Sequence, residues 1–287
     1  MKSTLLFISL LLILVALIVE NIFREAKNIP SNTNDPFNST RAYNHLKEIA
    51  KERHPIASEA NKKVQDYIVG QLKNIKNNIA NNTNVAMEIV DSDDTELLWS
   101  SNSNEYFKSS NVLCKVIGKN EALDPSSPSF LLSAHYDSVP SSYGASDDGG
   151  GIAILLEVVE KIVSQGQPSY TLIVNFNNGE EFGLLGSKSF AKHQWFENVA
   201  VFLNMEGGGT GGKEFIFRST NAELSKLYGE SATHPTGDSI GGDFIRSGLI
   251  RSVTDFSIYA DTYGIPGLDI AFVERRVFIK NFIPFRF

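Results

Sequence analysis

The chain has 287 residues, of which 42% are hydrophobic and 21% are charged. This composition is typical of a globular protein with a sizeable core, and it excludes a disordered or fibrous chain. Acidic residues outnumber basic residues by 33 to 26, which gives a formal net charge of -7. Because this charge has the wrong sign for a protein that binds phosphate backbones, we expect no nucleic-acid partner.

The chain contains one cysteine, Cys114. A single sulfur can form neither an intrachain disulfide nor a thiolate zinc cluster. A metal ion in this protein would therefore be held by histidine and carboxylate side chains.

The N-terminal segment is an uncharged apolar run from Ser3 to Val19. The run is barely long enough to span a bilayer, and no small residues form a cleavage site after it. We therefore expect residues 1–27 to be a transmembrane signal anchor rather than a cleaved signal peptide. Residues 28–36 are polar and contain two prolines, which is typical of a linker. The folded, lumenal domain is expected over residues 37–276.

Two glycosylation sequons begin at Asn38 and Asn81. Sequons favour a lumenal domain, although asparagine-rich chains also contain them by chance. We interpret Asn38 and Asn81 as glycosylation candidates, with ordinary surface asparagines as the alternative.

Two amphipathic helices are predicted at the start of the domain, over residues 42–50 and 64–75, with His54-Pro55 breaking the chain between them. Apolar runs typical of strands follow at 85–90, 111–117, 130–134, 170–176, 199–203, 214–217 and 268–273. Helical patterns at 150–163 and 184–193 separate several of these runs, whereas 91–110 indicates a solvated loop. This alternation predicts an α/β domain with a mixed, mostly parallel central sheet flanked by helices.

Polar side chains follow three of the predicted strands. They are His135 to Asp137, Glu180 with Glu181, and Glu206, joined by Asp147 and Asp148 before a helical pattern. Ligands of open α/β sheets bind outside the carboxyl ends of the strands, so we expect these segments to converge on one crevice.

Imidazole and carboxylates without a thiol suit zinc or a similar divalent ion. Two such ions about 3.5–4 Å apart can hold an attacking water and a scissile carbonyl. One side chain of the Glu180-Glu181 pair can bind metal while the other takes a proton, because adjacent side chains at a strand end point in different directions. Each motif alone has an ordinary interpretation, such as a surface histidine, solvated glutamates or a helix cap at Asp147-Asp148. Their combination in one chain favours a metal site.

These motifs resemble the dizinc aminopeptidase family in order and spacing. The matching segments are AHYDS at 134–138, GASDDG at 144–149, NGEE at 178–181 and NME at 204–206. Within this family the chain is similar to the group that contains the fungal vacuolar membrane protease and the endoplasmic reticulum metallopeptidase. The segments that carry this closer likeness are FRST at 217–220, GLIRS at 248–252, TDF at 254–256 and GLDIAF at 267–272. The resemblance implies a zinc exopeptidase fold over residues 37–276.

The resemblance also implies a metal site with two zinc ions. His135, Asp147 and Glu206 would hold one ion, and Asp147 would bridge to a second ion held by Glu181. The peptide bond between Asp147 and Asp148 would be cis.

The implied reaction is hydrolysis of an N-terminal peptide bond. Glu180 would be the general base, and Asp137 would hydrogen-bond His135 and fix its tautomer.

The C-terminal end departs from the family pattern. In the family, a Tyr-His-Thr segment after the stretch that matches residues 271–276 supplies the last histidine of the second zinc site, whereas residues 277–287 contain no histidine. His45, His54, His193 and His234 do not match that position, and we interpret them as non-ligands. The chain also ends before the further membrane spans of fungal vacuolar relatives. We therefore expect a C-terminally truncated product with an atypical tail, an incomplete second zinc site and low activity.

The leading interpretation is a membrane-anchored zinc metallopeptidase of the aminopeptidase type that acts on peptides or proteins. We expect it at the vacuolar membrane with a lumenal catalytic domain, with the endoplasmic reticulum membrane as the alternative. A second interpretation is a catalytically impaired peptidase-fold membrane protein. A third keeps the catalytic core but changes the bond, as in carboxypeptidases and acyl-transferring cyclases of related fold. None of these patterns defines an oligomeric state.

Overall fold

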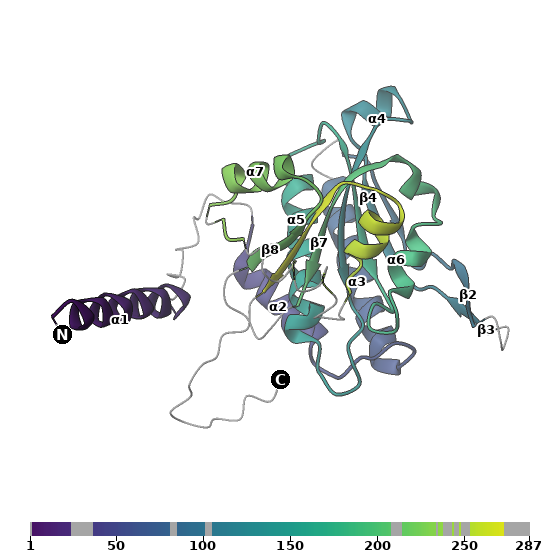
Figure 1. The fold of residues 1–287 in the computed structure, drawn as a ribbon. Coiled ribbons are helices and arrows are strands. Elements are labelled where there is room, and N and C mark those ends of the chain that lie inside the picture. Colours follow the sequence, from purple (N-terminus) through teal and green to yellow (C-terminus); the bar gives the residue numbers. More distant parts are fainter. Residues whose placement is uncertain are drawn as a thin grey trace.

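The structure, a computed structural model, describes residues 2–23, 37–80, 85–100, 105–207, 214–233, 235–237, 243, 247 and 253–272. Helix α1 (Lys2–Phe23) lies apart from the domain that contains the central sheet and the other helices (Figure 1). The expected linker over residues 28–36 lies outside the described residues.

Helix α1 covers the N-terminal apolar run, and its large apolar side chains between Leu6 and Leu17 are exposed. In the part of the chain that the structure describes, no helix combines the length and the apolarity needed to cross a membrane. The transmembrane anchor expected over residues 1–27 is therefore not confirmed.

A seven-stranded mixed sheet forms the centre of the domain, in the order β1-β4-β6-β5-β7-β9-β8 (Figure 1). The strands are β1 (Met87–Val90), β4 (Val112–Val116), β5 (Ser129–His135), β6 (Thr171–Asn177), β7 (Val199–Glu206), β8 (Glu214–Ser219) and β9 (Gly267–Phe272). Each of the predicted strand runs forms one of them. The pairings β6-β5, β5-β7 and β7-β9 are parallel, and β1-β4, β4-β6 and β9-β8 are antiparallel. The mixed sheet is thus confirmed, with a parallel centre rather than a mostly parallel order.

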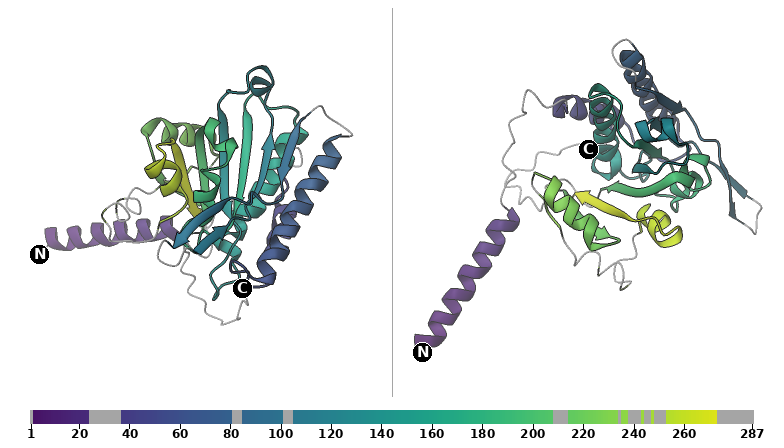
Figure 2. Two further views of the ribbon diagram at one scale, coloured as in Figure 1. Left: turned by 90° about the vertical axis from the view of Figure 1, so that its right-hand side faces the viewer. Right: turned by 90° about the horizontal axis from the view of Figure 1, so that it is seen from above.

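Both faces of the central strands are covered. Adjacent residues of β6 show this, because Val174 packs in the cluster with α3 (Glu59–Ala80) and α5 (Gly150–Ser164), whereas Ile173 packs in the cluster with Phe190 and Tyr259 on the opposite face. Strands buried on both faces read as nearly continuous apolar runs, which is why the sequence revealed them. Helix α3 contacts β1, β4 and α5 along one face (Figures 1 and 2).

The predicted helices are present, with additional short ones between them. The elements are α2 (Ser39–Ile49), α3 (Glu59–Ala80), α4 (Lys119–Leu123), η1 (Ala145–Gly149), α5 (Gly150–Ser164), α6 (Leu185–Phe190), η2 (Gln194–Asn198), α7 (Ala222–Ser231) and η3 (Ser257–Thr262). The Asn38 side chain caps α2 by accepting a hydrogen bond from the Arg41 N–H at 3.0 Å.

The prediction of a solvated loop over residues 91–110 was wrong. Strands β2 (Glu96–Ser100) and β3 (Glu105–Lys108) pair there as an antiparallel hairpin that projects from the side of the domain (Figures 1 and 2). Leu97 is buried, and β2 contacts α6. The polar residues before and between the strands hid two short segments with apolar and aromatic residues.

Candidate metal centre

The carboxyl ends of three parallel strands bring the predicted site residues to one edge of the sheet. His135 ends β5, Glu206 ends β7, and Asn177 ends β6 just before the Glu180-Glu181 pair. The register pairs His135 with Asn177. This alignment places the residues that follow the three strands at the same edge of the sheet, where the shared crevice was expected.

His135, Asp147 and Glu206 form a cluster in which one ligand atom from each residue lies within 4.8 Å of the others. His135 Nε2 is 3.1 Å from Asp147 Oδ1 and 3.8 Å from Glu206 Oε2. His135 and Glu206 are buried, whereas the Asp147 side chain is 43% exposed. The cluster therefore opens to solvent on the side of Asp147.

A close approach of two backbones sets Asp147 beside Glu206. Asp147 lies in η1, and its peptide bond to Asp148 is cis, as the resemblance implied. A Cβ atom on Gly207 would lie 2.3 Å from Ser146 O and 2.4 Å from Asp147 Cα. Only glycine lets the residue after Glu206 pass this close to the Asp147 turn, so the two carboxylates can face one point.

The His135 ring is held by Asp137. Nδ1 of His135 lies 2.9 Å from the Asp137 carbonyl oxygen and 3.5 Å from its carboxylate Oδ1. The expected contact between Asp137 and His135 is thus present, and its shorter branch goes to the backbone carbonyl of Asp137 rather than to the carboxylate. When Nδ1–H donates to this carbonyl, the lone pair of Nε2 faces Asp147 and Glu206, which is the orientation a metal ligand requires.

The Asp137 carboxylate binds the turn that carries both glutamates. Its Oδ1 accepts hydrogen bonds from the N–H groups of Gly179 at 2.8 Å and Glu180 at 3.1 Å, and its Oδ2 accepts one from Glu181 at 3.2 Å. Gly179 has φ +94°, a conformation that favours glycine. One residue thus fixes the histidine and the Glu180-Glu181 turn relative to each other.

Both glutamates of this turn are half-buried, and neither belongs to the three-residue cluster among the described residues. Burial raises the pKa of Glu181, and the negative charge of Asp147 raises it further. Glu181 therefore lies within the electrostatic reach of Asp147.

Buried carboxylates give the site a strong negative field. Burial raises the pKa of Glu206 well above its ordinary value, and it raises the pKa of Glu180 to about 9. Burial alone would lower the pKa of His135, but hydrogen bonds to Asp137 and Asp147 raise it well above its usual range. Raised pKa values mean that these groups bind protons more readily, because the site is short of positive charge. A divalent cation between His135, Asp147 and Glu206 would supply that charge.

A zinc ion fits these residues. Glu206 Oε1 is buried and has no hydrogen-bond partner in the described parts of the chain. Such an oxygen is costly unless a cation or a water binds it. One imidazole nitrogen with carboxylates, and a side open to solvent, is the ligand set of zinc sites that keep an exchangeable position.

The other predicted residues lie outside this centre. Asn38 is exposed, while Asn81, His234 and residues 277–287 are outside the described residues. The remaining histidines do not join the cluster, because His45 contacts Tyr67, His54 contacts the Glu52 carbonyl and His193 caps η2. They stay interpreted as non-ligands.

Sequence reasoning missed a set of buried asparagines around Gly179. Asn61, Asn111 and Asn178 are at most 4% exposed. Asn61 stands three residues before Val64 on the apolar face of its helix, and a polar residue in that position was the available signal.

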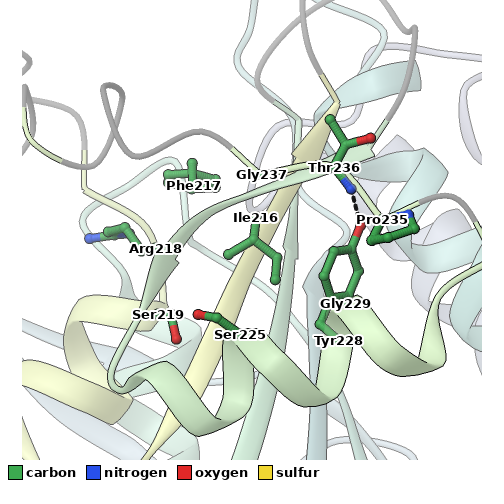
Figure 3. A pocket seen from close by; sticks show the side chains of 10 residues that line it. All are labelled: Ile216, Phe217, Arg218, Ser219, Ser225, Tyr228, Gly229, Pro235, Thr236 and Gly237. Atoms are coloured by element: carbon green, nitrogen blue, oxygen red, sulfur yellow. Dashed lines mark hydrogen bonds between the residues drawn. The ribbon is translucent and has the colours of Figure 1, made fainter.

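A cavity of about 540 Å³ lies between β8, α7 and residues 235–237 (Figure 3). Tyr228 lines it and accepts a hydrogen bond from the Thr236 N–H at 3.3 Å. Arg218 lies at its border, and its guanidinium donates to Asp269 and Thr254. None of the described lining residues belongs to the metal cluster, so this cavity is separate from the chemistry at the strand ends.

Residues 111–280 match the family model described as Peptidase family M28. The chain belongs to this family. It is 38% identical over 277 residues to a vacuolar membrane protease of Debaryomyces hansenii, in an alignment that covers 94% of this chain and 26% of that protein. The chain thus spans about a quarter of the length of this curated relative.

Solved structures share the fold. A zinc aminopeptidase from Bacillus subtilis matches with a TM-score of 0.59 and 14% identity, covering 87% of this chain and 88% of that chain. A glutaminyl cyclase from Porphyromonas gingivalis matches with a TM-score of 0.58 and 17% identity, covering 85% and 86%. At these identities the likeness shows the fold alone, and it is the mixed α/β fold of zinc exopeptidases.

Proposed function

We propose that this chain carries the catalytic domain of a zinc metallopeptidase of the aminopeptidase type. The observation that carries the proposal is the cluster of His135, Asp147 and Glu206 beside Glu180, in a chain that belongs to Peptidase family M28. The substrates are peptides or proteins with a free amino terminus.

His135, Asp147 and Glu206 hold the zinc ion in this proposal. Zinc, when bound, polarises the scissile carbonyl and lowers the pKa of a water. Glu180 takes a proton from the attacking water and passes it to the leaving amine. Asp137 keeps the His135 ring and the backbone N–H of Glu180 in fixed positions.

We further propose that Asp147 and Glu181 bind a second zinc ion weakly. The exposure of Asp147 and the effect of its charge on Glu181 support this pairing. Within this sequence, Asp147 and Glu181 would offer this ion two carboxylates. Two protein ligands are fewer than zinc sites ordinarily have.

Zinc content and hydrolysis, measured together on the full chain, test this function. After chelation, we expect no cleavage of aminoacyl p-nitroanilides, and one zinc per chain should restore it with a second ion binding only at higher concentration. A chain extended by the family's Tyr-His-Thr segment should bind two ions tightly and turn over faster.

The same experiment separates the alternatives. No cleavage at saturating zinc in either chain would favour the catalytically impaired protein. Release of a C-terminal residue from N-blocked peptides, or cyclisation of an N-terminal glutamine, would favour a carboxypeptidase or a cyclase. The cyclisation assay is informative because the fold is similar to that of the P. gingivalis glutaminyl cyclase.

We propose that the protein acts at the vacuolar membrane, because the D. hansenii relative is named a vacuolar membrane protease. The endoplasmic reticulum membrane is the alternative location. Exposed Asn38 at the start of the domain would carry a glycan if the domain is lumenal. Cell fractionation identifies the membrane with which the protein associates. A glycosidase-sensitive mobility shift that is lost in Asn38→Gln shows that the domain lies on the lumenal side. A soluble, unglycosylated chain would contradict both proposals.

A further inference from the structure

Helix α3 places an asparagine against the turn that carries Glu180. Asn61, in the first turns of this helix, is 4% exposed. Its Nδ2 donates to Asn178 Oδ1, and Asn178 Nδ2 donates to Asn61 Oδ1, both at 3.0 Å. The two amides therefore form a reciprocal pair between residues that are 117 positions apart.

Asn178 is fixed on its other sides as well. Its backbone N–H donates to Asn111 Oδ1 at 2.9 Å, and its Nδ2 also donates to Ser110 Oγ at 2.7 Å. Because both polar atoms of its side chain are hydrogen-bonded, Asn178 has one preferred orientation. It directly precedes Gly179, so its position sets where the turn toward Glu180 begins.

The amide pair and Asp137 hold this turn from two sides. Asp137 accepts the backbone N–H groups of Gly179 and Glu180, while Asn61 binds the side chain of Asn178. Glu180 thus projects from a segment whose backbone is anchored both to the histidine strand and to helix α3.

Asn61 also reaches the segment that contains Asp137. Its Nδ2 donates to the His54 carbonyl at 3.2 Å, and the same carbonyl accepts the Ser138 N–H at 3.3 Å. The His54 N–H donates in turn to Ser138 Oγ at 3.1 Å. The Asn61 side chain therefore contacts Asn178 directly and is linked to Ser138 through the His54 carbonyl.

We propose that Asn61 is a positioning residue for Glu180. Through its amide pair with Asn178 it holds the Glu180 turn in register with the metal centre. This inference rests on the proposed function for the role of Glu180. The part that states that Asn61 holds the turn in place can be tested without any activity.

The chemistry of the pair separates positioning from simple packing. Replacing both partners of a buried hydrogen-bonded pair with apolar groups of similar shape can be nearly neutral for stability. Leucine has the branched shape of asparagine and the same number of non-hydrogen side-chain atoms, so we expect Asn61→Leu with Asn178→Leu to keep the fold. The oriented contact to the Glu180 turn is lost in the same variant.

The test compares the full chain, Asn61→Leu and the double variant with Asn61→Leu and Asn178→Leu. Gln65→Leu is the matched control, because Gln65 is a buried amide one turn further along α3 whose Nε2 donates to the carbonyls of Asp91 and Ser110. The readouts are kcat and KM on an aminoacyl p-nitroanilide, zinc content, thermal stability, and hydrogen exchange of residues 178–184 by mass spectrometry.

We expect kcat to fall by about 10- to 100-fold in both Asn61 variants, with KM and the first zinc ion retained, because small misplacements of a reacting group cost this much. Exchange of the amides of residues 179–181 should become faster in these variants and not in Gln65→Leu. Unchanged kcat and exchange would overturn the proposal, as would equal losses in Gln65→Leu. An inactive parent chain would overturn the proposed function, and exchange alone would then decide whether Asn61 holds the turn.

Discussion

Replacing Glu180 with glutamine should lower kcat by about 10³-fold while the first zinc ion stays bound. Glutamine has nearly the same size as glutamate and can keep the backbone hydrogen bond to Asp137, but it cannot accept a proton. General base catalysis contributes roughly 10²–10⁴-fold to the rate, so the loss should fall in this range. Steady-state kinetics and metal analysis of the same preparation measure both parts of the prediction.

The exposed Glu223→Gln on α7 is the matched control and should leave kcat unchanged. Turnover of Glu180→Gln at the parent rate would remove Glu180 from the role of base. Loss of the first zinc ion in this variant would instead make Glu180 a ligand, which would contradict its place outside the three-residue cluster.

In the proposed mechanism, the environment of Glu180 gives a reason why a base at this position would need the metal. Burial raises its pKa to about 9, and the charge of His135 lowers it. A carboxyl with this pKa is protonated at neutral pH and cannot accept a proton. A divalent cation at the neighbouring ligands would lower the pKa of Glu180, as the charge of His135 does, and would so make Glu180 available as the proposed base.

The sheet and the opening helices could be predicted from the sequence because burial on two faces produces long apolar runs. Strands β5 and β6 are of this kind, with Leu131 and Ile173 buried against one face and Ala134 and Val174 against the other. The β2–β3 hairpin was missed for the opposite reason, since it projects from the domain and its apolar residues stand among polar ones.

The proximity of His135 and Glu206 could be predicted because these two residues end adjacent parallel strands. The position of Asp147 could not be predicted in the same way. Its turn is placed by the close approach of Gly207, which is a contact between segments that are distant in the sequence. The sequence also indicated Asp137, but the structure shows that its carboxylate binds mainly the backbone of residues 179–181. Asn61 was missed because a single polar residue in an amphipathic helix carries no sign of its partner.

Replacing His135 with glutamine should abolish the first zinc site and activity together. His135 Nε2 faces both Asp147 and Glu206, and no other described histidine lies in the cluster, so the variant leaves two carboxylates without the imidazole. Because partners that only orient a zinc ligand are worth 10–100-fold in affinity, loss of the ligand itself should weaken zinc binding by more than about 100-fold. Calorimetric zinc titration measures the change.

The control for this variant is His193→Gln, because His193 caps η2 away from the cluster. It should bind zinc and turn over as the parent chain does. Circular dichroism distinguishes a lost ligand from a lost fold, and we expect His135→Gln to stay folded because Glu206, whose pKa is raised by burial, can take up a proton in place of the cation. A folded His135→Gln that still binds one zinc tightly would place the metal elsewhere, and would leave the buried Glu206 Oε1 without the cation that its burial requires.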